Sequence, residues 1–229
     1  MADEFTHPFS AACGLIVTEK SQGTGYLVSP DKVVTCDHVV GQQDKVTIDF
    51  DGTKREAMVL KRDEFTDCAI LKLTQPLEGV VPLPVAGRCG FRALWDGYGF
   101  PGAGKGAGVP LEGLVLNPSG KDDLKAPALA LKSPEAAAGM STPLHGFSGS
   151  PVVVKGVVVG HIKRYIPDPD DPRRSAYGII YATPSSEVLK LLGVEPAIPS
   201  VEPFHSAPAA EADGERVLKL LKRWQNADL

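Results

Sequence analysis

His145-Gly-Phe-Ser-Gly-Ser-Pro151 is the stretch that constrains the fold of this chain most strongly. Its glycines, Gly146 and Gly149, permit backbone conformations with positive φ, which a side chain would penalise. A tight turn of this kind can hold the hydroxyl group of Ser148 outward while directing neighbouring backbone N–H groups toward one point in space. That arrangement suits a nucleophile with its own oxyanion hole. Taken alone, the stretch is explained equally well as a glycine-rich turn before a strand, so the rest of the chain must supply a base and an acid.

The composition is that of a water-soluble globular protein. The 229 residues are 43% hydrophobic and 23% charged, and the net charge of −4 gives no basic surplus for binding nucleic acid. The 24 glycines and 20 prolines favour many short strands joined by turns. The N-terminus shows no signal peptide, and no apolar stretch approaches the ~20 residues needed to cross a membrane. We therefore expect neither a nucleic-acid partner nor a membrane span.

The cysteines and their spacing argue against a metal centre. All four lie far apart and form no Cys-x-x-Cys pair, so neither a zinc site nor another cofactor is expected. Without an export signal, they read as reduced, mostly buried thiols of a cytoplasmic protein. A mature extracellular protein lacking its leader is the alternative.

Alternating apolar residues and turn signals predict an all-β fold. The first 75 residues contain about six short strands and one helical turn but no long helix, as expected of a small barrel or sandwich. These strands are predicted at residues 14–18, 23–29, 32–35, 45–50, 56–61 and 67–73, with the helical turn at 37–40. A proline-containing crossing over residues 75–88 leads to a second set, at residues 91–100, 112–116, 126–131, 151–155, 156–163 and 177–183.

Two helical segments and a linker follow the strands. A short helix is predicted to end at Gly193. Residues 195–212 are rich in proline and alanine and predict a semi-extended linker. Residues 213–229 then predict an amphipathic helix. This helix either packs on the protein's own barrel, docks a regulatory partner, or begins a further domain.

A histidine and an aspartate are placed to serve the serine. His38 follows a predicted strand at the start of the helical turn, and Asp67 opens an otherwise apolar strand. Either residue alone has an ordinary explanation, as a half-buried histidine or a turn-forming aspartate. Together with Ser148 they occur in the order His…Asp…Ser, each at the edge of a strand or turn.

At this point three motifs resemble those of trypsin-like serine peptidases, especially the bacterial HtrA-type and glutamyl-endopeptidase-type members. Gly23-Thr-Gly-Tyr-Leu-Val-Ser followed by Val-Val-Thr-Cys-Asp-His38-Val-Val is similar to their histidine motif. Thr-Asp67-Cys-Ala-Ile-Leu-Lys-Leu is similar to their aspartate motif, and Gly-Phe-Ser148-Gly-Ser-Pro to their serine motif. Tyr177-Gly-Ile-Ile-Tyr-Ala-Thr-Pro also resembles the last strand of an HtrA-type protease domain. The resemblance covers residues 12–193.

The resemblance implies two six-stranded antiparallel β-barrels, of about residues 12–75 and 89–193, packed face to face in a protease domain of residues 1–194 without a PDZ domain. It implies a serine endopeptidase acting on proteins or peptides. His38 would be the general base, Asp67 would hold its imidazole, and Ser148 would form the acyl-enzyme. The backbone N–H groups of Gly146 and Ser148 would bind the oxyanion.

The sequence departs from the animal enzymes in how it would be activated. Phe147 stands where those enzymes have the aspartate that receives a newly cut N-terminus, and the chain has no Ile-Val-Gly-Gly-like start. We therefore expect no activation by N-terminal clipping, which leaves loops or partners to control Ser148. Stripped domains of this kind occur as effectors of bacterial signalling or defence systems.

The substrate pocket is less well defined by sequence. Thr142 lies where the family places the floor of the pocket for the residue before the scissile bond. Because it is not an aspartate, a trypsin-like preference for arginine or lysine is not expected. Further pocket candidates are His145, His161, Ile162 and Lys163. Since strand side chains alternate between faces, the position of His161 in its strand leaves open whether its ring faces the pocket. The charges of Lys163 and Arg164 either attract an acidic residue or are simply solvated. A small, apolar or acidic residue is favoured.

Other functions fit the motifs less well. The glycine-rich segment 99–106 lacks the Ser or Thr and the following helix of a phosphate-binding loop. An α/β-hydrolase would need a further glycine after the serine and a different residue order. The alternative from another class is a protease-fold binding or signalling module, with a silent triad or one switched on only by a partner.

Overall fold

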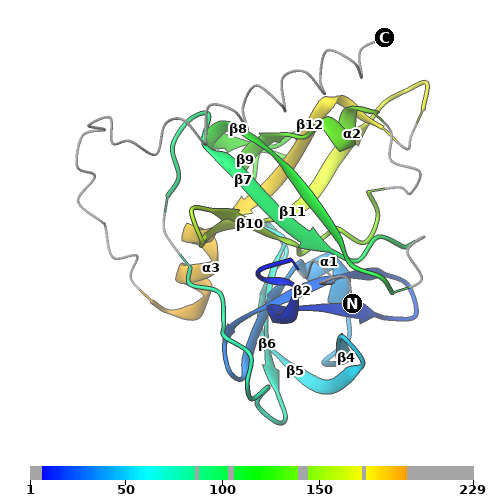
Figure 1. Ribbon diagram of the computed structural model, residues 1–229, viewed down its shortest axis with the longest axis vertical. Coiled ribbons are helices and arrows are strands. Elements are labelled where there is room, and N and C mark those ends of the chain that lie inside the picture. Colours follow the sequence, from blue (N-terminus) through cyan, green and yellow to red (C-terminus); the bar gives the residue numbers. More distant parts are fainter. Residues whose placement is uncertain (1–6, 86–87, 103–105, 139–143, 172–173, 195–229) are drawn as a thin grey trace, which may run out of the picture.

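Two closed β-barrels make up the structure, a computed structural model that describes residues 7–85, 88–102, 106–138, 144–171 and 174–194. Each barrel has six strands, and every pair of neighbouring strands within it is antiparallel. The barrels stack along the long axis of the molecule, with the N-terminal barrel below in Figure 1. The two-barrel fold predicted from the sequence is confirmed.

The N-terminal barrel closes in the order β1-β2-β3-β6-β5-β4. Its strands are β1 (Cys13–Val17), β2 (Gln22–Ser29), β3 (Lys32–Thr35), β4 (Lys45–Phe50), β5 (Thr53–Asp63) and β6 (Cys68–Leu73). Alternate residues point inward, so that Val46, Ile48 and Phe50 are buried while their neighbours are not. The short helix α1 (Asp37–Val40) follows β3 at the end of the barrel that faces its neighbour.

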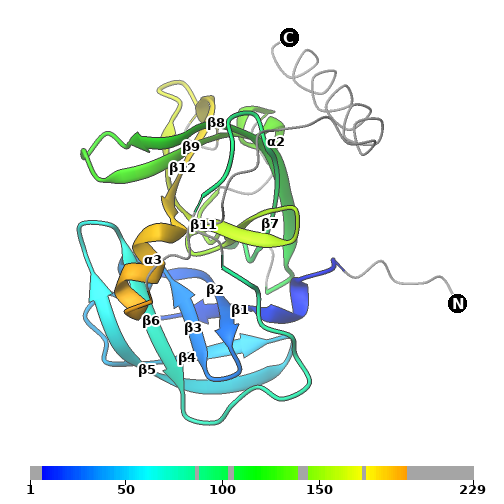
Figure 2. The same ribbon diagram turned by 90° about the vertical axis from the view of Figure 1, so that its left-hand side faces the viewer.

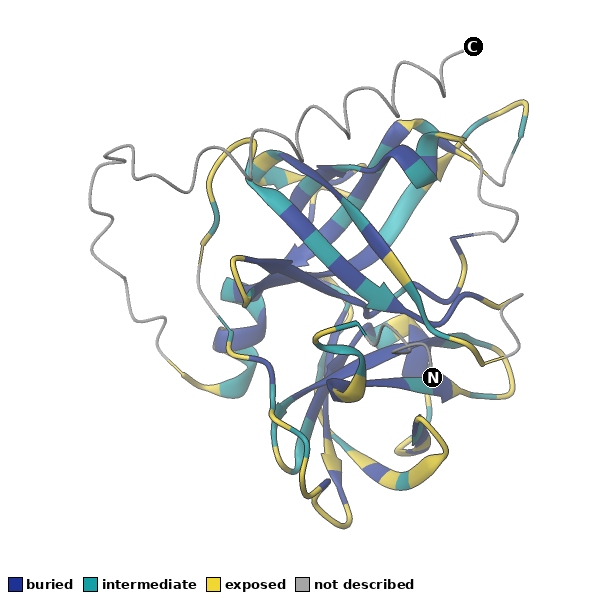
Figure 3. Ribbon diagram, viewed as in Figure 1, coloured by how far each residue is buried: buried dark blue, intermediate teal, exposed yellow. Residues whose placement is uncertain are grey.

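The C-terminal barrel closes in the order β10-β11-β12-β9-β8-β7. Its strands are β7 (Leu94–Gly99), β8 (Val109–Lys121), β9 (Pro127–Lys132), β10 (Pro151–Val154), β11 (Val157–Pro167) and β12 (Ser175–Pro184). Its separate apolar core is built around the fully buried Trp95, Leu131 and Phe147. Figure 3 shows the buried and exposed residues alternating along the strands of both barrels.

The segment that connects the two barrels is held by backbone contacts with both of them. Val85 forms a parallel bridge with Val158, and the N–H group of Leu83 donates to the carbonyl oxygen of Leu27. Helix α3 (Ser185–Leu192) ends at Gly193, which adopts the left-handed conformation expected of a helix stop. This helix lies at the junction of the two barrels in Figure 2, against β11 and β6. The described helices include none that is long and apolar enough to span a membrane.

The structure adds elements that the sequence did not indicate. A short 3-10 helix, η1 (Ser10–Ala12), precedes β1, and helix α2 (Pro134–Ala138) follows β9. Strands β5, β8 and β11 extend well beyond their predicted ends because long hairpins continue past the barrel cores. The predicted linker at 195–212 and the amphipathic helix at 213–229 lie outside the described residues.

Candidate active site

His38 is held at the rim of the N-terminal barrel by its buried neighbours. The residue belongs to α1, in which Val39 and Val40 are buried in the core. The preceding Cys36 is also fully buried, and its thiol donates to the carbonyl oxygen of Ile162 in β11 at 3.2 Å. These anchors fix the backbone on both sides of His38, whose own side chain is 47% exposed.

Asp67 forms two hydrogen bonds with His38. Its Oδ2 lies 2.7 Å from Nδ1 of the imidazole, and its Oδ1 accepts the backbone N–H of His38 at 3.0 Å. Because an ionised carboxylate only accepts hydrogen bonds, Nδ1 must carry the ring proton. The neutral ring therefore has its free lone pair on Nε2. That is the tautomer that a general base needs.

The carboxyl group of Asp67 is ionised at neutral pH. Burial by itself raises its pKa, but the hydrogen bonds and the charge of His38 together bring the pKa below its usual value of 3.8. The backbone of Asp67 has φ +56°, the left-handed region that a residue with a side chain seldom adopts. This conformation turns the side chain back toward His38 as the chain enters β6.

The turn that carries Ser148 needs both of its glycines. Gly146 has φ +98° and Gly149 has φ +86°. A Cβ atom at Gly149 would lie 1.9 Å from the carbonyl oxygen of Thr24, and one at Gly146 would lie 2.2 Å from that of Phe100. The glycines are therefore required by close backbone approach as well as by conformation.

Thr24 of the N-terminal barrel holds this turn in place. Its backbone N–H donates to the carbonyl oxygen of Ser148 at 2.8 Å. Its buried hydroxyl donates to the carbonyl oxygen of Gly146 at 2.9 Å and accepts the N–H of Phe100 at 3.1 Å. Two hydrogen bonds from Thr24 thus fix the serine turn of the opposite barrel, and the third joins Thr24 to Phe100.

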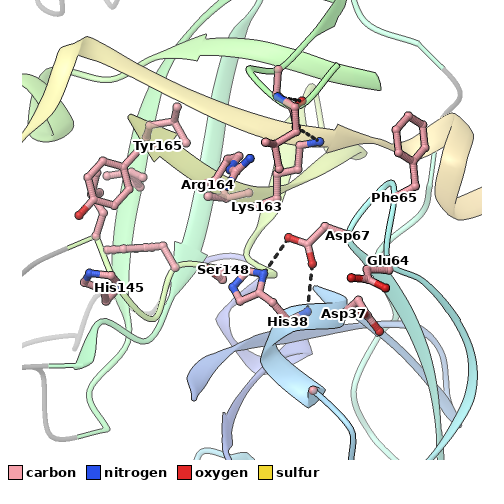
Figure 4. A pocket seen from close by; sticks show the side chains of 18 of the residues that line it. Asp37, His38, Glu64, Phe65, Asp67, His145, Ser148, Lys163, Arg164 and Tyr165 are labelled. Carbon is pink, nitrogen blue, oxygen red and sulfur yellow. Dashed lines mark hydrogen bonds and ion pairs between the residues drawn. The ribbon is translucent and has the colours of Figure 1, made fainter. Parts of the chain in front are cut away.

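His38, Asp67 and Ser148 open onto one cavity of about 620 Å³ between the barrels. Figure 4 shows the imidazole of His38 between the side chains of Asp67 and Ser148. The inner wall is apolar and comes from the C-terminal barrel: Leu111, Leu144, Phe147, Ile162 and Ile180. A base with an oriented ring, a hydroxyl group and an apolar recess therefore share one space.

A family model described as a trypsin-like peptidase domain matches residues 23–160, more than half of the chain. The chain belongs to the trypsin-like peptidase family. The matched residues contain all three members of the predicted triad. A search of curated proteins found no significant match.

Solved structures support the same fold for this trypsin-like peptidase domain. A mutant of Rv3671c from M. tuberculosis H37Rv, in an inactive form, is 22% identical, with a TM-score of 0.63 over 86% of this chain and 91% of that one. The active form of that protease is 21% identical, with a TM-score of 0.62 over 86% and 85% of the two chains. A serine protease of human pathogenic astrovirus is 20% identical, with a TM-score of 0.57 over 78% and 91%.

Only some of the residues that the sequence suggested for the substrate pocket of the peptidase domain line the cavity. His145 is exposed at the cavity, where its ring meets Tyr165 edge to face at 6.1 Å, and Ile162 forms part of the inner wall. His161 is fully buried and lies outside the cavity lining. Thr142 is outside the described residues.

Lys163 lines the cavity, but its charge is already matched. Its ammonium group lies 2.7 Å from Oδ2 of Asp122, and both side chains are at most 3% exposed. It also donates to the carbonyl oxygen of Pro127 at 3.1 Å. Burial by itself raises the pKa of Asp122, but the hydrogen bond and charge of Lys163 bring it below the usual value. The pair therefore presents little net charge to a bound group.

Several cavity residues were not indicated by the sequence. Asp122 is the main one, and the rim also contains Asp37, Glu64, Phe65 and Tyr165. Nothing in the local sequence of the β8–β9 hairpin distinguishes Asp122 from an ordinary turn residue. Its bonds to Leu124 and Ala126 within the hairpin do follow an aspartate-turn pattern, but the pairing with Lys163 depends on the barrel closing.

Cys36, His38 and Asp67 also offer metal-ligand atoms that all lie within 4.8 Å of one another. The bonds already described account for this grouping. Burial raises the pKa of the Cys36 thiol well above its usual value, and the thiol donates to a carbonyl group. A protonated thiol is a poor metal ligand, so the cluster fits the histidine–aspartate pair better than a metal centre.

The buried ring of His161 predicts a stability that depends on pH. Burial lowers the pKa of His161 to about 4 from its usual 6.5, and the charges of Lys163 and His38 act in the same direction, whereas Asp67 opposes them. Between these values the unfolded ring binds a proton that the folded ring does not. Stability is therefore fully present above pH 6.5 and falls as the pH falls toward 4, by up to about 3 kcal/mol.

Chemical denaturation at a series of pH values measures this slope directly. The variant His161→Gln removes the titrating ring, so its free energy of unfolding should change less between pH 6.5 and 4 than that of the native chain. The difference between the two curves isolates His161 from other groups, such as His7, whose pKa burial also lowers. Parallel curves would show that His161 does not titrate as assigned.

Proposed function

We propose that this chain is a serine endopeptidase that cleaves peptide bonds through His38, Asp67 and Ser148. The observation that carries the proposal is the pairing of His38 with Asp67. It places a ring proton on Nδ1, so that the neutral imidazole offers the lone pair of Nε2 in the cavity that Ser148 also lines. A histidine held in this tautomer beside a serine hydroxyl is the arrangement that activates a weak nucleophile.

The reaction proceeds in two displacements. Nε2 of His38 takes the proton of Ser148 as its Oγ attacks the carbonyl carbon of the scissile bond. Ionised Asp67 stabilises the resulting imidazolium through the 2.7 Å contact. The imidazolium then gives its proton to the departing amine, which leaves an ester on Ser148. Water repeats the same steps on this ester, which releases the acid and restores the hydroxyl group.

Two backbone N–H groups complete the proposed machinery. Those of Gly146 and Ser148 donate no hydrogen bond to any described residue, which leaves them available to a developing oxyanion. Their contribution would be on the order of several kcal/mol. Thr24, by fixing the carbonyl oxygens of Gly146 and Ser148, sets the orientation of the peptide groups in this turn.

Position 147 offers no charged side chain that could receive a newly cut N-terminus. The side chain of Phe147 is fully buried in the core of the C-terminal barrel and so offers no charge for a new amino terminus. We propose that access to Ser148 is instead governed by the loops around the cavity or by a partner.

The inner wall of the cavity favours an apolar residue before the scissile bond. Five apolar side chains form this wall, while Lys163 is already neutralised by Asp122. Among matched fluorogenic peptides that differ only at this position, leucine or phenylalanine should give kcat/KM about tenfold or more above glutamate, since each 1.4 kcal/mol of differential binding is a factor of ten. A preference for glutamate would show that a cation of the cavity, Lys163 or Arg164, is accessible to substrate as a free charge.

Fluorophosphonate labelling tests the proposed function itself. An assembled triad should react through Ser148, and mass spectrometry of the labelled peptide would locate the adduct there. A protein that stays unlabelled, and that cleaves none of the peptides, would instead be a binding or signalling module built on the peptidase fold.

A further inference from the structure

The proposed acid of the triad is held from the opposite barrel. Two consecutive carbonyl oxygens of the N-terminal barrel, those of Thr66 and Asp67, each accept a hydrogen bond from a side chain of the C-terminal barrel. His161 of β11 places Nε2 3.1 Å from the carbonyl oxygen of Asp67, and the hydroxyl group of Thr183 of β12 donates to that of Thr66. A carbonyl oxygen only accepts, so Nε2 of His161 carries the proton.

The two donors form one unit. His161 and Thr183 are directly opposite each other in the antiparallel pairing of β11 with β12. Both side chains are completely buried. A cross-strand pair of this kind is rigid because both backbones belong to the same barrel wall, so its two side chains can hold two adjacent peptide groups at a fixed spacing.

The held peptide groups need this support. Asp67 has φ +56°, a left-handed conformation that costs free energy for a residue with a Cβ atom, although aspartate tolerates it better than most. Its side chain must point back at His38 to make the 2.7 Å contact. A relaxation of this backbone would carry the carboxylate away from the imidazole. The hydrogen bonds to the carbonyl oxygens of residues 66 and 67 oppose that relaxation.

Burying the polar ring of His161 costs free energy, which only a useful hydrogen bond would justify. The other ring nitrogen, Nδ1, is buried with no hydrogen-bond partner among the described residues, as is the hydroxyl group of the neighbouring Tyr26. An apolar side chain of similar size would avoid burying this unpaired nitrogen. Among the described contacts of this side chain, the one that needs a hydrogen-bond donor is the bond from Nε2 to the carbonyl oxygen of Asp67.

We propose that His161 and Thr183 are positioning residues, which hold the peptide groups of Thr66 and Asp67 so that the carboxylate meets His38 in its productive orientation. This inference rests on the proposed peptidase function. His161 does not line the cavity, so its role differs from the substrate contact that the sequence first indicated. It acts through Asp67.

The variant His161→Leu removes the donor while keeping the site apolar and filled. We expect kcat to fall by about 100-fold, the scale of a misplaced catalytic group, with KM changed less than about twofold because the cavity wall is untouched. The melting temperature should change little, since the variant removes an unpaired buried nitrogen but leaves the carbonyl oxygen of Asp67 without its donor. His161→Gln, whose amide nitrogen can occupy the place of Nε2, should recover most of the lost kcat.

Thr183→Val provides a second, nearly isosteric test. It removes only the donor to Thr66, and we expect kcat to fall by about tenfold, again at constant KM. Ile48→Val is the matched control, since Ile48 is fully buried in the N-terminal barrel and outside the cavity lining. It should lower the melting temperature without changing kcat per active site.

All rates are expressed per fluorophosphonate-reactive site at a temperature well below the melting transition of each variant. A native-like kcat in both His161→Leu and Thr183→Val would overturn the positioning role and leave the peptidase assignment intact. The positioning role is overturned equally if the loss of kcat only tracks the melting temperature, as set by Ile48→Val. If the native chain neither hydrolyses peptides nor reacts with the probe, both proposals fall together.

Discussion

Replacement of Ser148 with alanine should lower peptide hydrolysis by about 10⁴–10⁶-fold. The loss is this large because without the Oγ atom no acyl-enzyme can form, whatever the state of the base. The fold should survive, since the turn is fixed by the carbonyl oxygens of Gly146 and Ser148 and not by the removed hydroxyl group. Steady-state assays with an apolar peptide, paired with a melting curve, measure both effects.

Ser150 offers a matched control for this substitution. It lies two residues further along the same turn, and its buried hydroxyl group has no hydrogen-bond partner among the described residues. Ser150→Ala should therefore hydrolyse peptides at a native-like rate. A Ser148→Ala protein with full activity would refute the nucleophile, and equal losses in the two variants would mean that the turn itself had been disturbed.

The variant Asp67→Asn should reduce kcat by about 10⁴-fold at neutral pH, nearly as much as the loss of the serine. If the amide nitrogen takes the place of Oδ2, it donates to Nδ1 of His38, and the ring proton must move to Nε2. The base then faces Ser148 with a hydrogen already in place. The backbone bond from His38 to Oδ1 can persist, so the geometry should change little.

Asp31→Asn controls for the loss of a negative charge. Asp31 forms its contacts with Ser29 and Lys32 at a hairpin outside the cavity lining. Its substitution should leave kcat unchanged. For Asp67→Asn, a neutron structure or the ¹⁵N NMR shifts of the His38 ring would verify the altered tautomer. A reduction of less than about tenfold would assign the role of the acid to a different carboxylate.

The sequence predicted the parts of the site that local patterns encode. Short strands bounded by turn residues indicated the two barrels, and the positions of His38, Asp67 and Ser148 stood out because each interrupts a strand or turn with a chemically useful side chain. The need for glycine at position 149 could also be anticipated. Its physical reason, the approach to the carbonyl oxygen of Thr24, could not.

What remained beyond the sequence depends on barrel closure. The partners of Lys163 and His161 lie 41 and 94 residues away in the chain, for Asp122 and Asp67 respectively, and no local pattern joins such pairs. Charge alone made Lys163 a candidate for binding an acidic substrate, and only the neutralising contact with Asp122 changes that interpretation. Helix α2 was missed because five residues are too few for a helical repeat to emerge.

The two barrels hold each other's reactive groups: Thr24 fixes the serine turn of its neighbour, while His161 and Thr183 fix the peptide that carries Asp67. The proposed activity would thus depend on both barrels together, and neither barrel would be an interchangeable module. A chimera that joins one barrel of this protein to the other barrel of a distant homologue should fold yet turn over poorly. Introducing into the homologue's barrel whichever of the three holding side chains it lacks should recover the rate.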